Sequence, residues 1–160
     1  MTPAQALAFV ERHGLVLQSA RVARHGPGGG TLPSLAEAVA GGPIRGSWWG
    51  HPKGRAIYAA CEAVEASADV LRCKLVDGKV TYVHRRLWPA LARLAEPIAA
   101  RLGPGRLDRT WSEHTPSGAH RARRQPFPAW VPADVRAAAA RLPEADARAA
   151  LAETGWRQPL

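Results

Sequence analysis

The sequence is poor in cysteine and in the motifs that hold metals or catalyse reactions. Its only cysteines, Cys61 and Cys73, form no Cys-x-x-Cys pair, so we expect buried, reduced thiols rather than a disulfide framework. The six histidines include no His-x-x-x-His or HExxH arrangement, and His114 with His120 is only a loose pair. We therefore expect no metal and no cofactor, and no single residue is marked as catalytic.

Long apolar runs are also missing. A helix that crosses a bilayer needs about 18 or more consecutive apolar residues, and no stretch of this chain approaches that length. The first residues lack a basic segment and reach an acid at Glu11, which is unlike a secretory signal. The sequence thus predicts a cytoplasmic protein with no membrane contact.

Acidic residues are scarce relative to basic ones. Asp and Glu total 13 against 22 Lys and Arg, which gives a net charge of +9. A surface of that charge attracts phosphate polymers. Most of the bases are arginine, however, and a GC-rich genome favours arginine over lysine without any functional demand, so a generic cationic surface and another anionic partner remain the alternatives. Hydrophobic residues at 46% still predict a packed core, and the length fits one domain, residues 1–160.

Local signals predict three helices in the first part of the chain. A helix over residues 3–13 follows Thr2 as its cap, and a short strand follows at residues 15–17. Ser34, with Glu37 three positions later, predicts a second, short helix. A longer helical pattern covers residues 52–67.

The run DVLRCKLVDGKVTYVH predicts a β-hairpin around a two-residue Asp77-Gly78 turn. If Val76 pairs with Lys79, the opposed residues include Cys73 with Tyr82 and Leu71 with His84. Arg72 and Lys74 would then lie on the opposite, partly basic face.

Three further segments complete the chain. Residues 85–102 have a helical pattern, residues 103–132 contain five prolines and predict an irregular basic strap, and residues 133–152 predict two Ala-rich helices divided at Pro143. Helix, strand, helix, helix and hairpin is the order of a winged helix. The expected fold is therefore α+β, with a winged-helix-like core over residues 1–102, a two-stranded hairpin and additional C-terminal helices. Another α+β domain with the same order is the alternative.

The segment GSWWGHPKGR is the most unusual in the chain. A helix that begins there would offer free backbone N–H groups to phosphate, and an exposed tryptophan would stack on a base. Alternatively, one or both tryptophans anchor the core. The candidate nucleic-acid-binding residues here are Trp48, Trp49, His51, Lys53 and Arg55.

Basic residues gather between Tyr82 and Arg124, where nine arginines face three acids. Together with the basic face of the hairpin, this region is the best candidate for phosphate contacts. A solvated face whose arginines pair with acids is the alternative. The candidate residues are Arg72, Lys74, Arg85, Arg86, Arg93, Arg121, Arg123 and Arg124.

The runs PSLAEAVAG, WWGHPKG and KVTYVHRRLWPALARL together resemble short bacterial proteins related to the AlkZ-type DNA glycosylases, over about residues 1–100. The resemblance implies a winged-helix character and a link to DNA repair. The chain is far shorter than a full-length glycosylase and has no Gln-x-Gln or Gln-x-Asp motif to match the catalytic one. The resemblance therefore implies DNA binding more than base excision.

Three functions remain open from the sequence. The first is a nucleic-acid-binding protein, with DNA favoured over RNA, that uses an arginine-rich face. The second is a small enzyme with a pocket around Trp49, His51, Tyr82 and His84. The third is a protein-interaction module, dimeric through the Ala-rich C-terminal helices.

Overall fold

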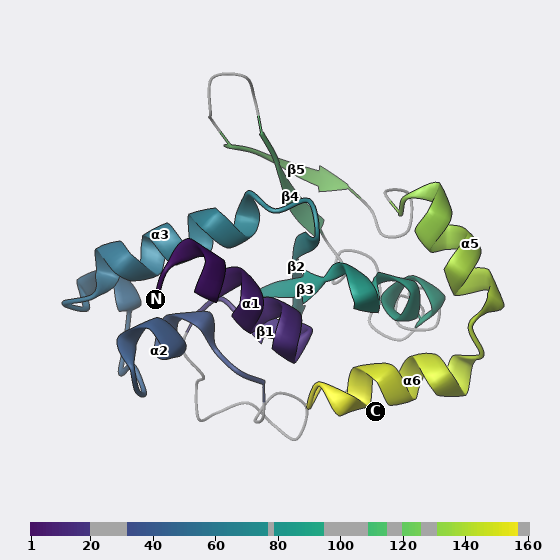
Figure 1. Ribbon diagram of the computed structural model, residues 1–160, viewed down its shortest axis with the longest axis horizontal. Coiled ribbons are helices and arrows are strands. Elements are labelled where there is room, and N and C mark those ends of the chain that lie inside the picture. Colours follow the sequence, from purple (N-terminus) through teal and green to yellow (C-terminus); the bar gives the residue numbers. More distant parts are fainter. Residues whose placement is uncertain (20–31, 77–78, 95–108, 115–119, 126–130, 157–160) are drawn as a thin grey trace.

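The computed structural model describes residues 1–19, 32–76, 79–94, 109–114, 120–125 and 131–156 (Figure 1). At residues 73–76, 79, 109–114 and 120–125 the description covers the backbone alone. The predicted GPGGG loop and the Asp77-Gly78 turn lie outside the described residues. The fold is α+β, as the sequence predicted, with helices packed around an antiparallel sheet.

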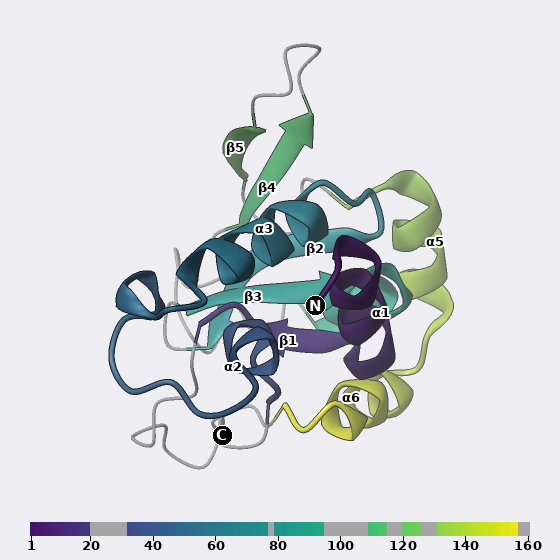
Figure 2. The same cartoon turned by 60° about the vertical axis from the view of Figure 1, so that its left-hand side comes forward.

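The centre of the sheet is formed by three antiparallel strands in the order β1-β3-β2: β1 (Leu15–Leu17), β3 (Lys79–His84) and β2 (Val70–Val76). Beyond β2 the sheet continues into β4 (Arg109–His114) and β5 (His120–Gln125). Figure 2 shows β4 and β5 projecting away from the helices that cover the central strands.

Helices α1 (Pro3–His13), α2 (Leu35–Ala40) and α3 (Gly54–Glu65) lie on one face of the central strands. Val16 of β1 and Tyr82 of β3 project from that face into a core that includes Val10 and Ile57. On the opposite face, Leu15, Leu17, Leu71 and Val83 pack against residues of 88–94 and of helices α5 (Ala133–Arg141) and α6 (Glu144–Glu153). Apolar side chains on both faces explain why all three residues of β1 are buried.

Local capping interactions start α1 and α2, and a glycine ends α1, at the positions that the sequence predicted. The Thr2 hydroxyl accepts from the Gln5 N–H, and the Gln5 side chain accepts from the Thr2 N–H, which completes a capping box at the start of α1. Gly14, with φ of 73°, ends α1 and turns the chain into β1. The Ser34 hydroxyl accepts from the Glu37 N–H at 3.2 Å and caps α2.

The predicted start of α3 is corrected by two residues, because His51, Pro52 and Lys53 form a turn before the helix. The Gly54 N–H donates to the His51 carbonyl at 2.7 Å. A side chain at position 54 would meet the Trp49 and Trp48 carbonyl oxygens at 3.1 and 3.3 Å. The glycine thus lets the helix begin directly against the preceding turn.

The predicted hairpin register is wrong beyond its first pair. Val76 does pair with Lys79, but Lys74 then pairs with Val80, and the register stays shifted so that Arg72 faces Tyr82. The shift between Lys74 and Val76 is a bulge at Leu75, which changes the face that residues 70–74 of β2 share with their partners in β3. Leu71 and Val83 therefore share one face, and Arg72 and Tyr82 the other.

The irregular strap predicted over residues 103–132 is corrected at the two segments of it that the structure describes as strands. Residues Arg109–His114 and His120–Gln125 pair along their length as strands β4 and β5. The prolines that suggested irregularity lie outside the two strands, at positions 104, 116, 126, 128 and 132. Neither strand has apolar alternation, which is the usual sequence signal for a strand.

Candidate nucleic-acid interface

Adjacent tryptophans before α3 have opposite environments. Residues Trp48–Gly50 form one turn of 3-10 helix, which the Ser47 hydroxyl caps by accepting from the Trp49 N–H. Trp48 is 8% exposed and belongs to the core between α1, α2, α3 and the sheet, whereas Trp49 is 68% exposed. The sequence did not decide whether each tryptophan is buried or exposed. In the structure Trp48 is buried and Trp49 is exposed.

Trp49 contacts two aromatic rings, those of Trp48 and of Tyr58 in α3. Its ring stacks on Trp48 with centroids 4.1 Å apart and planes inclined by 21°. Tyr58, 46% exposed, approaches Trp49 at a centroid distance of 5.9 Å and an angle of 44°. One face of the Trp49 ring is thus supported by the core, and most of the side chain is open to solvent.

The solvent face of α3 continues this aromatic surface. Ile57, Ala60, Cys61 and Val64 point into the core, as the helical spacing requires. The exposed face carries Arg55, Ala56, Tyr58, Ala59 and Glu62.

A hydrogen bond from the Tyr58 hydroxyl to Glu62, one turn further along α3, raises the pKa of Tyr58 above its ordinary value. The tyrosine ring is therefore held along the helix. We call the exposed residues Trp49, Arg55, Ala56, Tyr58 and Ala59 the α3 surface.

The cations close in sequence to the start of α3 differ in their contacts. The Lys53 ammonium donates to the Ala40 carbonyl at 2.8 Å and so caps the end of α2. Arg55 and Arg45 are exposed, and among the described residues neither has a hydrogen bond or an ion pair. His51 is half-buried, and its Nδ1 accepts from the Lys53 N–H at 3.1 Å. Arg45 and Tyr58 were not among the residues that the sequence singled out.

Two of the candidate arginines are paired with carboxylates. Arg72 Nε lies 3.1 Å from Glu65 Oε1, with both side chains largely buried. Arg85 lies 2.8 Å from Asp134 Oδ2 at the start of α5, and its hydrogen bond lowers the pKa of Asp134. These guanidinium charges are neutralised by their partners, so they add little to a phosphate-binding field.

Two other candidate arginines bond to backbone carbonyls. Arg86 donates to the Glu11 and Arg12 carbonyls at the end of α1, both at 3.3 Å. Arg93 donates to the Leu142 carbonyl at 3.1 Å, between α5 and α6. A carbonyl does not neutralise a cation, so these arginines keep their charge while they hold helices together.

The remaining candidates lie where only the backbone is described. Lys74 is in β2, next to the bulge. In the projecting pair of strands, Arg121 is opposite Glu113, Arg123 opposite Trp111 and Arg124 opposite Thr110. Adjacent positions alternate between the two faces of a strand, so Arg123 and Arg124 lie on different faces.

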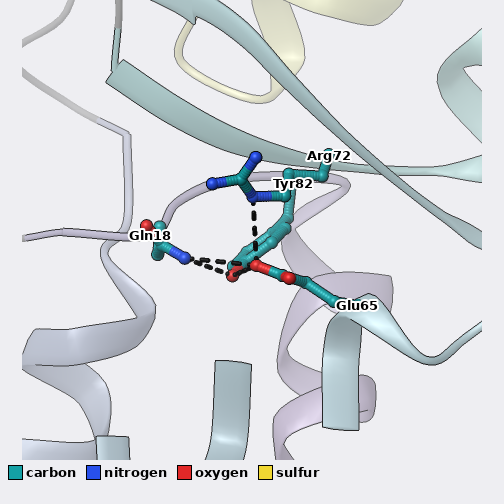
Figure 3. Close-up of polar contacts among 4 residues, drawn as sticks. All are labelled: Gln18, Glu65, Arg72 and Tyr82. Atoms are coloured by element: carbon teal, nitrogen blue, oxygen red, sulfur yellow. Dashed lines mark hydrogen bonds and ion pairs between the residues drawn. The ribbon is translucent and has the colours of Figure 1, made fainter. Parts of the chain in front are cut away.

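A polar network beneath the other end of α3 was not expected from the sequence (Figure 3). The hydroxyl of Tyr82, a fully buried residue, donates to Glu65 Oε1 at 2.7 Å and accepts from Gln18 Nε2 at 2.8 Å. Gln18 and Arg72 also donate to Glu65 Oε1, at 3.2 and 3.1 Å. No sequence motif marks this network, because its residues come from four separate segments.

The four residues of the proposed enzyme pocket have separate partners. Tyr82 bonds to Glu65 and Gln18 inside the fold. Trp49 contacts aromatic rings at the surface. The His84 ring accepts from the Arg86 N–H, and the His51 ring from the Lys53 N–H.

No protein-family model, curated protein or solved structure matches the chain. Within the described part of the chain, no group of three or more His, Cys, Asp or Glu residues is placed to hold a metal ion. None of the helices in that part is long and apolar enough to cross a membrane.

Proposed function

We propose that the protein binds DNA through a winged-helix-like arrangement in which α3 is the recognition helix. The element order α1, β1, α2, α3, β2, β3 and the strand order β1-β3-β2 support this reading. In such folds the third helix enters the major groove and the hairpin flanks it. The resemblance to short relatives of the AlkZ-type glycosylases favours DNA over RNA and a repair-associated role.

The observation that carries the proposal is the exposed α3 surface with Arg55 in its first turn. Ala56 and Ala59 are small, so a nucleic-acid backbone or groove edge can approach the helix closely. Arg55 has no partner among the described residues, which leaves its guanidinium available for a phosphate or a base edge. Glu62 lies further along α3 and repels phosphate, so contact is expected at the first two turns of the helix.

The charge of the whole chain supports the same partner. Its excess of nine positive charges provides a long-range attraction for DNA. Lys53, Arg86 and Arg93 contribute to that field because their partners are carbonyls. Arg72 and Arg85 are assigned to the stability of the fold instead.

Fluorescence anisotropy with a short labelled duplex at several salt concentrations tests the proposal. Arg55→Ala should weaken binding several-fold and reduce the slope of log K against log salt by about 1. Arg141→Ala is the matched control, because Arg141 is also exposed but lies at the end of α5, and it should change affinity little. No detectable binding at low salt, or equal effects of the two variants, would contradict the proposal.

A further inference from the structure

We infer that Trp49 is a stacking site for an unpaired base, so that the preferred ligand is DNA with an unstacked nucleotide. The inference rests on the proposed function and specifies its substrate class. It depends on three observations: the exposure of Trp49, the way its ring is supported, and the charges around it.

The exposure of Trp49 is unusual for so large an apolar side chain. Tryptophan is highly buried on average because its ring carries a large apolar surface. Only Met1, Trp49 and Tyr58 are exposed large hydrophobic residues in the described part of the chain. Two of these three are in contact with each other. The exposed aromatic surface is therefore concentrated at one place, next to the start of α3.

The Trp49 ring is held in position before any ligand arrives. Trp48 is anchored in the core and lies under one face of the ring. The His51 N–H donates to the Trp48 carbonyl at 3.0 Å, and the Gly54 N–H donates to the His51 carbonyl. These bonds fix the turn that carries both rings. A preorganised ring loses little conformational freedom when a ligand stacks on it.

The charges close to Trp49 in sequence favour a nucleic acid over a protein as its ligand. A flat apolar surface alone would also suit a protein partner. Arg45 and Arg55 are exposed within a few residues of Trp49, and Lys53 lies between them in sequence. A flat ring close in sequence to exposed cations matches a nucleotide, which joins an aromatic base to an anionic phosphate.

An intact duplex does not offer the surface that Trp49 can bind. Its bases are stacked on one another, and only their edges are accessible in the grooves. A ring that stacks on a base face needs a bulged, mismatched, frayed or single-stranded nucleotide. Among these substrates, a nucleotide bulge in a duplex combines an unstacked base with the groove that α3 requires.

The test compares three labelled ligands: a paired duplex, the same duplex with a one-nucleotide bulge, and one of its single strands. The wild-type protein should prefer the bulged over the paired duplex by about tenfold, the range expected for one stacked base. Trp49→Ala should abolish this preference, so that the bulged and the paired duplex bind the variant with equal affinity. Trp49→Phe keeps an aromatic ring and should retain most of the preference. Because Trp49 is exposed, both variants should fold, which circular dichroism checks.

The outcomes separate the inference from the proposed function. Binding of the paired duplex that depends on Arg55, with no preference for the bulge, would overturn the inference alone. A preference that persists in Trp49→Ala would do the same. Absence of binding to all three ligands would overturn both. If Trp49→Ala instead changed only self-association in sedimentation, the surface would be an interface between copies of the chain, and the inference would be wrong.

Discussion

The phenolic hydroxyl of Tyr82 donates to Glu65 Oε1 at 2.7 Å and thereby joins strand β3 to the last turn of α3 (Figure 3). Arg72 of β2 and Gln18 bond to the same carboxylate oxygen. The network fixes one end of α3 on the sheet, while the Trp48 turn fixes the other. The α3 surface is thus held at both ends by the fold.

Tyr82→Phe should destabilise the protein by about 1–3 kcal/mol, because the buried hydroxyl both donates to Glu65 and accepts from Gln18. Urea unfolding measures the change. Tyr58→Phe is the matched control, since its hydroxyl is exposed and bonded only along α3, and it should leave the unfolding midpoint unchanged. Equal midpoints for the wild type and Tyr82→Phe would show that the network contributes nothing to stability.

Arg72→Leu distinguishes a structural arginine from a phosphate-binding one. Arg72 and Glu65 are 24% and 19% exposed in their side chains, so loss of their ion pair should cost about 1–2 kcal/mol, between surface and buried pairs. Affinity for duplex DNA should fall no more than in the Arg141→Ala control. Urea unfolding and anisotropy provide the two measurements. A loss of affinity as large as that of Arg55→Ala, without a loss of stability, would show that Arg72 contacts DNA rather than stabilising the fold.

The sequence predicted those features that depend on near neighbours in the chain. The caps at Thr2 and Ser34 and the end of α1 at Gly14 are set by local hydrogen bonds and by backbone freedom, and all three are confirmed. The pair Val76 and Lys79 was also predicted from its turn.

Features that depend on tertiary packing were missed. The bulge at Leu75 has no local signature, and it alone places Arg72 on the same face as Tyr82, where the sequence predicted opposite faces. Nor does sequence distinguish Trp48 from Trp49, because burial is decided by which ring meets the core. The roles of Arg72 and Arg85 required knowledge of Glu65 and Asp134, their partners in space.

Gly14→Ala should destabilise the protein by about 2 kcal/mol or more. The residue has φ of 73°, and a Cβ there would lie 2.6 Å from an Arg86 guanidinium nitrogen and 2.7 Å from the Leu87 side chain. Leu87 is buried and cannot move aside freely. Gly42→Ala is the control, because no atom lies within 4 Å of its added Cβ, and its effect on the thermal midpoint should be small. A similar midpoint for both variants would contradict this role of Gly14.

Stability should fall at alkaline pH through the buried thiol of Cys61. Burial raises the pKa of Cys61 from 9.0 to about 11, and burial also raises the pKa of Tyr82. Well below pH 9 the thiol is protonated in both the folded and the unfolded state, so it does not make the free energy of unfolding depend on pH. Above pH 9 the unfolded chain ionises first, so the free energy of unfolding decreases, by about 2 kcal/mol at pH 11 from Cys61 alone.

Urea unfolding of the wild type and Cys61→Ala between pH 7 and pH 11 isolates this contribution. The variant should lose less stability over the interval from pH 9 to pH 11, whatever its stability at pH 7. It should still lose some, because Tyr82 remains buried in the variant. Parallel curves for the two proteins would mean that the Cys61 thiol ionises equally easily in the folded and unfolded states, which its burial against Tyr82 and Glu65 argues against.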